Sequence, residues 1–172
     1  PIDFTPGVFN IKFDEYKTNN QVNTTLAHQL ALYVLIYSPL QMACDLPEHY
    51  MKDGKIHPAF QFITDVGVDW ETSKVLDGEI GDFVVIARKE KNTENWFVGG
   101  ITNEERREVK VNFDFLPEGK TFQAIVYKDA EDAHWDTNPE AYEIERFEVT
   151  NVSDLSILLA EGGGFALSIM EK

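Results

Sequence analysis

The sequence predicts a mixed fold, in which a mostly helical segment over residues 1–66 precedes an all-β antiparallel sandwich over residues 67–172. The run over 26–37, LAHQLALYVLIY, is apolar on almost every side, whereas a surface helix has a polar face. From residue 67 the apolar residues recur with a period of two, which is typical of strands. Charge is also uneven: residues 1–66 hold 7 acidic and 4 basic residues, a net charge of -3, and the remainder carries -12.

The first segment reads as the end of a larger α/β body. Ile2 and Phe4 could close a short buried strand, and Pro39 ends or bends the apolar helix. Two further short helices are expected, over 48–51 and 58–64. A strand followed by a buried helix is typical of the last β/α unit of a (β/α)8 barrel. Because nothing else in the N-terminal third could cover the apolar helix, and no Met precedes Pro1, we expect a piece of a longer protein.

The second segment reads as seven or eight short strands separated by turns. Alternation is plainest over 109–115, where Val109, Val111, Phe113 and Phe115 alternate with polar residues. Turn residues stand at 117–119, 136–139 and 162–164. Such spacing predicts an antiparallel sandwich. The expected strands lie near 68–70, 83–87, 96–101, 109–115, 122–127, 142–149, 155–159 and 165–169.

Composition narrows the partner classes. The net charge is -15 and the sequence pI about 4.5, so the surface repels phosphate backbones and anionic membranes, and we expect neither nucleic acid nor membrane as a partner. The apolar run over 26–37 is shorter than the ~20 residues of a membrane span. Cys44 is the single cysteine, which excludes an intrachain disulfide but does not decide the compartment.

Two pairs of residues in the first segment are candidates for ligand contact. Active sites of barrels lie at the carboxyl ends of their strands, so Asp3 and Thr5 could contact a substrate. An ordinary strand end with polar capping groups is the alternative. His28 and Gln29 interrupt the apolar run; they could orient a ligand, but such residues more often satisfy neighbouring backbone groups.

Candidate chemistry in the second segment is sparse. Residues 129–136 gather four carboxylates and a histidine, and oxygen-rich loops can hold calcium, although a solvated acidic loop explains the same pattern. Trp96 and Trp135 could stack on sugar rings, or belong to the core. Residues 162–164, three glycines, read as a tight turn. No pair of carboxylates in the sequence can be assigned as the acid and the base of a reaction from spacing alone.

Four stretches together resemble the C-terminal end of glycoside hydrolase family 97. They are DFTPGVF at 3–9, NTTLAHQLALY at 23–33, SPLQMA at 38–43 with DLP at 45–47, and GGGFA at 162–166. The stretch from VDW at 68–70 to GEIGD at 78–82 is similar to the family's link into its last domain. The likeness therefore covers nearly the whole chain, and the order and spacing of the motifs make it specific.

The resemblance implies a parent enzyme with an N-terminal β-sandwich, a catalytic barrel and a C-terminal β-domain. It implies a calcium-dependent α-glucosidase or a retaining α-galactosidase, the form at 23–47 being closer to the α-glucosidases, in a periplasmic or secreted bacterial protein. No position here matches the family's catalytic or calcium-binding carboxylates, and Glu48 and Glu71 are not assigned to those roles. We therefore expect no catalytic residue, metal ligand or cofactor within this chain.

Two hypotheses follow for the chain itself. In the first, it is the C-terminal portion of a glycosidase that acts on oligosaccharides, and it supports the barrel. In the second, residues 67–172 are a carbohydrate-binding or interaction module that uses Trp135. If the apolar helix is uncovered, its exposed surface should also favour self-association or contact with the remainder of the parent enzyme.

Overall fold

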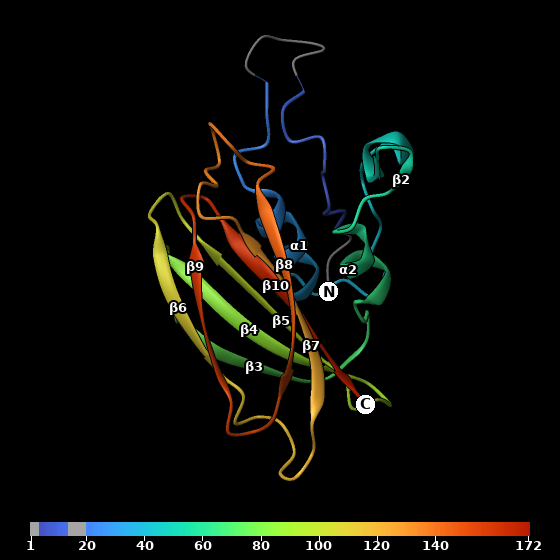
Figure 1. Ribbon diagram of the computed structural model, residues 1–172, viewed down its shortest axis with the longest axis vertical. Coiled ribbons are helices and arrows are strands. Elements are labelled where there is room, and N and C mark those ends of the chain that lie inside the picture. The colour runs from blue at the N-terminus through green and yellow to red at the C-terminus, as the bar shows by residue number, and fades with distance from the viewer. Residues whose placement is uncertain (1–3, 14–19) are drawn as a thin grey trace.

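The computed structural model describes residues 4–13 and 20–172, and it is mostly β, with 44% of residues in strands and 12% in helices. Six antiparallel strands form one sheet in the order β3-β4-β5-β10-β7-β8 (Figure 1). They are β3 (Trp70–Glu79), β4 (Phe83–Glu90), β5 (Trp96–Thr102), β10 (Gly164–Glu171), β7 (Phe122–Asp129) and β8 (Tyr142–Val149). β6 (Arg107–Asn112) pairs antiparallel with β9 (Asp154–Leu159) to form a second, two-stranded sheet.

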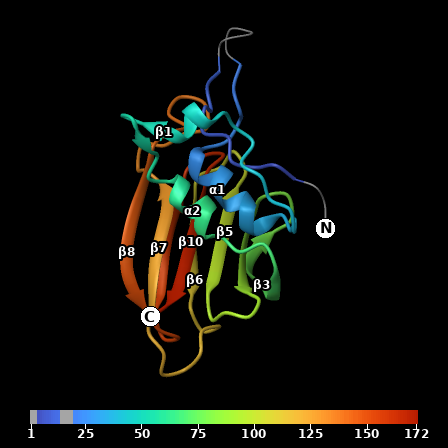
Figure 2. The same cartoon turned by 90° about the vertical axis from the view of Figure 1, so that its right-hand side faces the viewer.

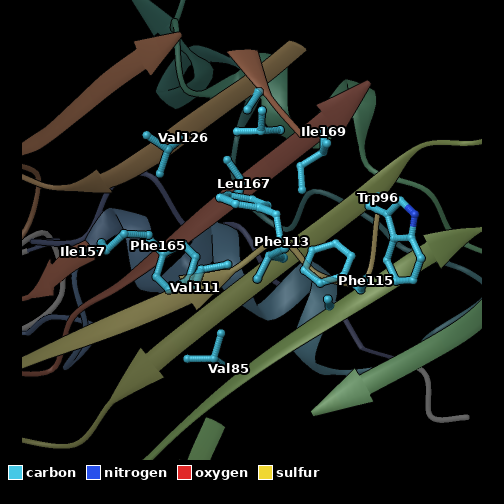
Figure 3. Close-up of a cluster of buried hydrophobic side chains, with 14 of the residues drawn as sticks. Val85, Trp96, Val111, Phe113, Phe115, Val126, Ile157, Phe165, Leu167 and Ile169 are labelled. Carbon is cyan, nitrogen blue, oxygen red and sulfur yellow. The ribbon is translucent and has the colours of Figure 1, made fainter. Parts of the chain in front are cut away.

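The inter-sheet core fills the space between these two sheets. Alternate residues of the central strands face it, among them Val98 on β5 and Phe165 and Leu167 on β10. Val111 on β6 and Ile157 on β9 meet them from the opposite sheet (Figure 3). Because the other face of the same strands is also covered, β5 and β10 are buried along most of their length.

Two helices cover the opposite face of the large sheet, namely α1 (Leu26–Leu35) and α2 (Phe60–Asp65), as Figure 2 shows. Leu30 and Val34 of α1 pack with Phe97 of β5 and Phe62 of α2. We call this cluster the helix–sheet core. A 3-10 helix, Pro47–Tyr50, and the small hairpin of β1 (Met51–Lys52) with β2 (Lys55–Ile56) lie between α1 and α2 in the chain.

Glycines in the sheet let α1 approach closely. A Cβ added at Gly99 would lie 2.8 Å from the carbonyl oxygen of Ala31 and 3.0 Å from Cβ of Val34. A Cβ at Gly164 would lie 2.9 Å from Cα of His28. Any side chain at these two positions would therefore push the helix away from β5 and β10.

Both ends of α1 are tied to the sandwich. At the first end, the backbone N–H of Thr25 donates to the carbonyl of Gly162, at 3.2 Å, and the Thr25 hydroxyl caps the first turn by accepting from the backbone N–H of His28. At the other end, the Arg88 guanidinium of β4 donates to the carbonyls of Val34 and Leu35. Carbonyl groups in the last turn of a helix have no hydrogen-bond donor within the helix, so Arg88 supplies one. The helix and the sheet are thus joined by polar contacts as well as by packing.

The predicted fold class was wrong for residues 1–66. The described part of this segment forms no barrel unit; its helices pack on the sandwich of the same chain. Phe4 forms an isolated parallel bridge with Gln41, and Ile2 lies outside the described residues. The apolar pattern correctly required a buried helix, but periodicity does not specify the surface that buries it. That surface is the outer face of β5 and β10. These strands begin at Trp96 and Gly164, far from α1 along the chain.

All the predicted strands of the second segment are present; β8 has the predicted bounds, and the others differ at one or both ends. The strand predicted over 109–115 ends at Asn112, yet Phe113 and Phe115 still enter the inter-sheet core from the following turn. β3 is longer than predicted and extends to Glu79. The division into a barrel end and a sandwich domain at residue 66 stays a prediction. Among the described residues, no helix is both long and apolar enough to cross a membrane.

Candidate functional site

The 5–10 segment, which contains Thr5 of the predicted substrate contact, is held against α1 by hydrogen bonds. Asp3 lies outside the described residues, and Thr5 is exposed at the surface. Next to Thr5, the side-chain oxygen of Gln29 accepts from the backbone N–H groups of Gly7 and Val8, each at 3.4 Å. Gln29 therefore serves the backbone, as expected of a polar residue in an apolar helix, and the substrate contact of Asp3 and Thr5 stays a prediction.

Two buried tyrosine hydroxyls fix the same segment. The Tyr33 hydroxyl lies 3.0 Å from the carbonyl oxygen of Pro6, to which it donates. The Tyr50 hydroxyl donates to the carbonyl of Gly7 at 2.8 Å and accepts from the backbone N–H of Asp45. Burial raises the pKa of Tyr50 to about 12 and raises that of Tyr33 further, so both hydroxyls keep their protons and act as hydrogen-bond donors.

Asp45 closes this network from the other side. Its carboxylate accepts from the backbone N–H groups of Phe9 and Asn10, both at 2.8 Å, and from that of Leu46. His49 Nδ1 lies 2.6 Å from the same carboxylate. Partial burial opposes ionisation, but these hydrogen bonds outweigh it and hold the pKa of Asp45 below its ordinary value. The carboxylate is thus committed to structure.

A small pocket opens at the other end of α1, with a volume of about 270 Å³. Its wall combines one indole with amides, a carboxylate and an imidazole, and consists of Asn23, His28, Thr102, Asn103, Glu104, Trp135 and Gly162. His28 Nδ1 lies 3.1 Å from the carbonyl oxygen of Gly162, and burial lowers the pKa of His28 to about 4. His28 is therefore neutral at pH 7 and is engaged with a backbone group.

The two candidate tryptophans differ in position. Trp96 lies in the inter-sheet core, with its ring 4.7 Å from that of Phe115, and is 4% exposed. It cannot stack on a sugar. Trp135 is half-buried at the pocket, and its ring stacks on that of His134. Of the two residues, Trp135 alone keeps the geometry that the carbohydrate-binding hypothesis needs.

The acidic loop does not converge on a metal site. Asp129 points inward and accepts from the backbone N–H groups of Ala160 and Gly164, at 2.9 and 2.8 Å. Asp132 instead accepts from Asn138, and Asp136 accepts from Gln21. Across residues 4–13 and 20–172, no group of three or more His, Cys, Asp or Glu side chains could hold a metal ion.

Asp129 is the functional-looking residue whose role the sequence did not reveal. Burial raises its pKa to about 6, although hydrogen bonds from Thr25, Ala160 and Gly164 favour the charged form. The carboxylate joins the N-cap of α1 to the turn before β10, so its role is to hold that turn. Asp129 is the last residue of the alternating strand β7, which sets it apart from the carboxylates of the following loop. In the sequence it reads as one more member of that acidic loop, so its structural role could not be recognised.

Comparison with known proteins identifies the family. A family model described as "Glycosyl-hydrolase 97 C-terminal, oligomerisation" matches residues 69–170. A "Retaining alpha-galactosidase" of Bacteroides thetaiotaomicron is 36% identical over 98% of this chain. A glycoside hydrolase family 97 enzyme of Pseudoalteromonas sp. strain K8 is 45% identical over the whole chain, with a TM-score of 0.92, and structures of it contain panose or acarbose.

These relatives are much longer than this chain, which spans 25% of the Bacteroides protein and 26% of the Pseudoalteromonas one. The likeness is nevertheless continuous through both cores. The chain therefore belongs to glycoside hydrolase family 97, and it contains the C-terminal domain that the family model describes.

Proposed function

We propose that this chain is the C-terminal part of a longer family 97 enzyme that cleaves α-glucosidic bonds of oligosaccharides. The observation that carries the proposal is the unbroken likeness, at 45% identity, to an enzyme seen in complex with panose and acarbose. Panose consists of α-linked glucose units. The α-galactosidase relative is less similar, at 36% identity, and supports α-galactosides as the alternative substrate class.

Within that enzyme, we assign the chain a supporting role. The carboxylates of Asp45 and Asp129 each accept from two or more backbone N–H groups, so both are engaged in holding the fold. The same contacts that commit them hold the 5–10 segment and the turn before β10 in place. Acid–base chemistry is therefore assigned to the remainder of the enzyme, which this chain stabilises.

Calcium and location remain part of the proposal. Among the described residues, no group of three or more His, Cys, Asp or Glu side chains could hold a metal ion, so we assign the calcium ligands to the remainder of the enzyme. We also propose a periplasmic or secreted location, which fractionation of expressing cells would test.

Hydrolysis assays test the proposal directly. The 172-residue chain and the longer protein that contains it would each be given p-nitrophenyl α-glucoside and p-nitrophenyl α-galactoside. We expect the longer protein to prefer the glucoside by kcat/KM and the 172-residue chain to show no turnover. Turnover by the chain alone would contradict the supporting role, and a preference for the galactoside would select the alternative substrate.

A carbohydrate-binding role is the second candidate, favoured by the pocket beside Trp135. Titration with maltooligosaccharides, followed by indole fluorescence, would measure it, and Trp135→Ala should remove the response. Absence of binding at millimolar sugar would leave the supporting role alone.

A further inference from the structure

The pocket beside Trp135 lies where three connections of the sandwich meet the start of α1 (Figure 1). The backbone N–H of Leu26 donates to the carbonyl of Pro139, in the loop before β8, at 2.8 Å. The backbone N–H of Gly162, in the β9–β10 turn, donates to the carbonyl of Asn103, in the β5–β6 loop, at 2.7 Å. Because backbone hydrogen bonds tie these walls to one another, the pocket is formed without a ligand.

The Trp135 side chain is fixed in this wall. Its backbone N–H donates to the carbonyl of Glu161, at 3.1 Å, and its ring is stacked on that of His134, with the ring centroids 5.8 Å apart. A Cβ added at Gly162 would lie 2.7 Å from Cβ of Trp135, so only glycine fits beneath the indole. The indole therefore presents a rigid, largely apolar surface to the pocket.

Most polar groups of the wall are already engaged within the chain. The Thr102 hydroxyl donates to the carbonyl of Glu105, at 3.0 Å. The Asn103 side chain accepts from the backbone N–H of Glu105 and donates to the Asp82 carboxylate, at 3.0 and 3.2 Å. His28 is bonded to a backbone carbonyl. These groups give the pocket its shape and do not require a ligand.

Asn23, before α1, and Glu104, in the β5–β6 loop, are the exception. Both residues line the pocket and are exposed, and within the described part of the chain neither side chain forms a hydrogen bond or an ion pair. The Glu104 carboxylate can only accept hydrogen bonds when ionised, whereas the Asn23 amide can both donate and accept. A ligand rich in hydroxyl groups would satisfy both.

The chemistry of the wall selects a neutral sugar. A sugar ring combines apolar C–H groups, which suit an indole, with hydroxyls that suit a carboxylate and an amide. An anionic ligand would be repelled by Glu104 and by the chain's net charge of -15. The pocket volume of about 270 Å³ is below the range of roughly 300–1,000 Å³ that is typical of small-molecule pockets, so it suits one sugar ring rather than a chain of rings.

We propose that this pocket binds the terminal ring of a neutral oligosaccharide, with the ring against the Trp135 indole and its hydroxyls bonded to Glu104 and Asn23. The inference rests on the carbohydrate-binding role proposed above as the second candidate. It adds the residues of the site, the preference for an uncharged ligand and the limit of one ring. It does not depend on which bond the longer enzyme cleaves.

Titration of the 172-residue chain with maltose, followed by the NMR signals of its three indole N–H groups, tests the proposal. Trp135→Phe assigns the Trp135 signal, which should shift with a dissociation constant of about 1–10 mM. The signal of Trp96, which is 4% exposed, should stay in place. Maltotetraose should bind within about threefold of maltose, since one ring is held, and glucuronate at least about tenfold more weakly.

Glu104→Gln should raise the dissociation constant of maltose by about tenfold, because a charged hydrogen-bond acceptor is lost. Glu105→Gln is the matched control: it removes the same charge from the next residue, which is exposed and does not line the pocket, and should leave binding unchanged.

Three results would overturn the proposal while leaving a carbohydrate-binding role standing: binding that Glu104→Gln does not weaken, equal binding of glucuronate, or an affinity that rises about tenfold from maltose to maltotetraose. If no sugar shifts any indole signal, the site and the carbohydrate-binding role fail together. Hydrolysis is measured separately on the longer protein, so each of these outcomes leaves the proposed activity to its own assay.

Discussion

The inter-sheet core and the helix–sheet core share one six-stranded sheet but treat polar groups differently. The first is filled by side chains such as Phe165 and Leu167, with apolar neighbours from both sheets. The second includes Tyr33 and Tyr50, whose hydroxyls bind backbone carbonyls of the 5–10 segment. The difference shows that one side of the sheet stabilises the sandwich by apolar packing, while the other also holds the 5–10 segment by hydrogen bonds.

The strongest test compares a truncation in each core. Leu167→Ala and Leu30→Ala remove side chains that are both 0% exposed, and each should lower the free energy of unfolding by about 2–5 kcal/mol. Because α1 packs directly on β5 and β10, we expect one cooperative transition for both variants in urea. A separate early transition in Leu30→Ala alone would show that the two cores unfold independently.

The next test uses the pH dependence of stability. The native pKa of Asp129 is raised to about 6, so the stability it contributes is largest below its unfolded pKa and is lost as pH rises from about 4 to about 6, by at most about 3 kcal/mol. The native pKa of His28 is lowered to about 4, so its contribution changes in the opposite sense over nearly the same interval. In the wild type the two effects therefore largely cancel.

Asp129→Asn should expose the His28 effect, and stability should then rise steeply as pH increases from about 4 to about 6.5. Urea denaturation at several pH values measures this slope. Asp132→Asn, an exposed carboxylate in the same loop, is the control and should keep the flat wild-type profile. An unchanged slope in Asp129→Asn would mean that Asp129 has an ordinary pKa in the folded chain.

A third comparison concerns the close approach of α1. Gly99→Ala places a Cβ 2.8 Å from a backbone oxygen of α1, so the helix must move, at a cost of about 1–3 kcal/mol. Gly67→Ala meets only the flexible side chain of Glu90, at 3.0 Å, and should change stability by about 0.5 kcal/mol or less. Thermal melts measure the difference. Equal melting temperatures for the two variants would contradict the close packing of α1 on Gly99.

The smallest expected effect concerns the C-terminal end of α1. Arg88→Met removes the donors to Val34 and Leu35 and should cost about 1 kcal/mol, since those carbonyls lose their partner. Lys91→Met removes only an exposed ion pair with Asp69, which contributes about 0–1 kcal/mol. If both variants lose equal stability, the Arg88 contacts do not cap the helix.

The strands of the sandwich could be predicted because their signals are local. Val109 and Val111 alternate with polar residues, and glycines at 119 and 162 adopt the positive φ that the predicted turns need. The 5–10 segment could not be predicted in the same way. Its partners Tyr33 and Asp45 read as ordinary residues until the fold brings them to one backbone segment, and Gln29, although it stands out in the apolar helix, does not reveal which backbone groups it serves.

The sequence by itself determined that a buried helix lies within 26–37, of which the structure makes 26–35 helical, and that alternating strands follow, because periodicity and turn preferences act over a few residues. Only the tertiary structure decided what buries that helix. Gly99 and Gly164 open space for it on the sheet, and neither glycine reveals its distant neighbour in the sequence. A barrel was therefore expected where the helix in fact packs on its own sandwich, since burial requires a surface but does not name one.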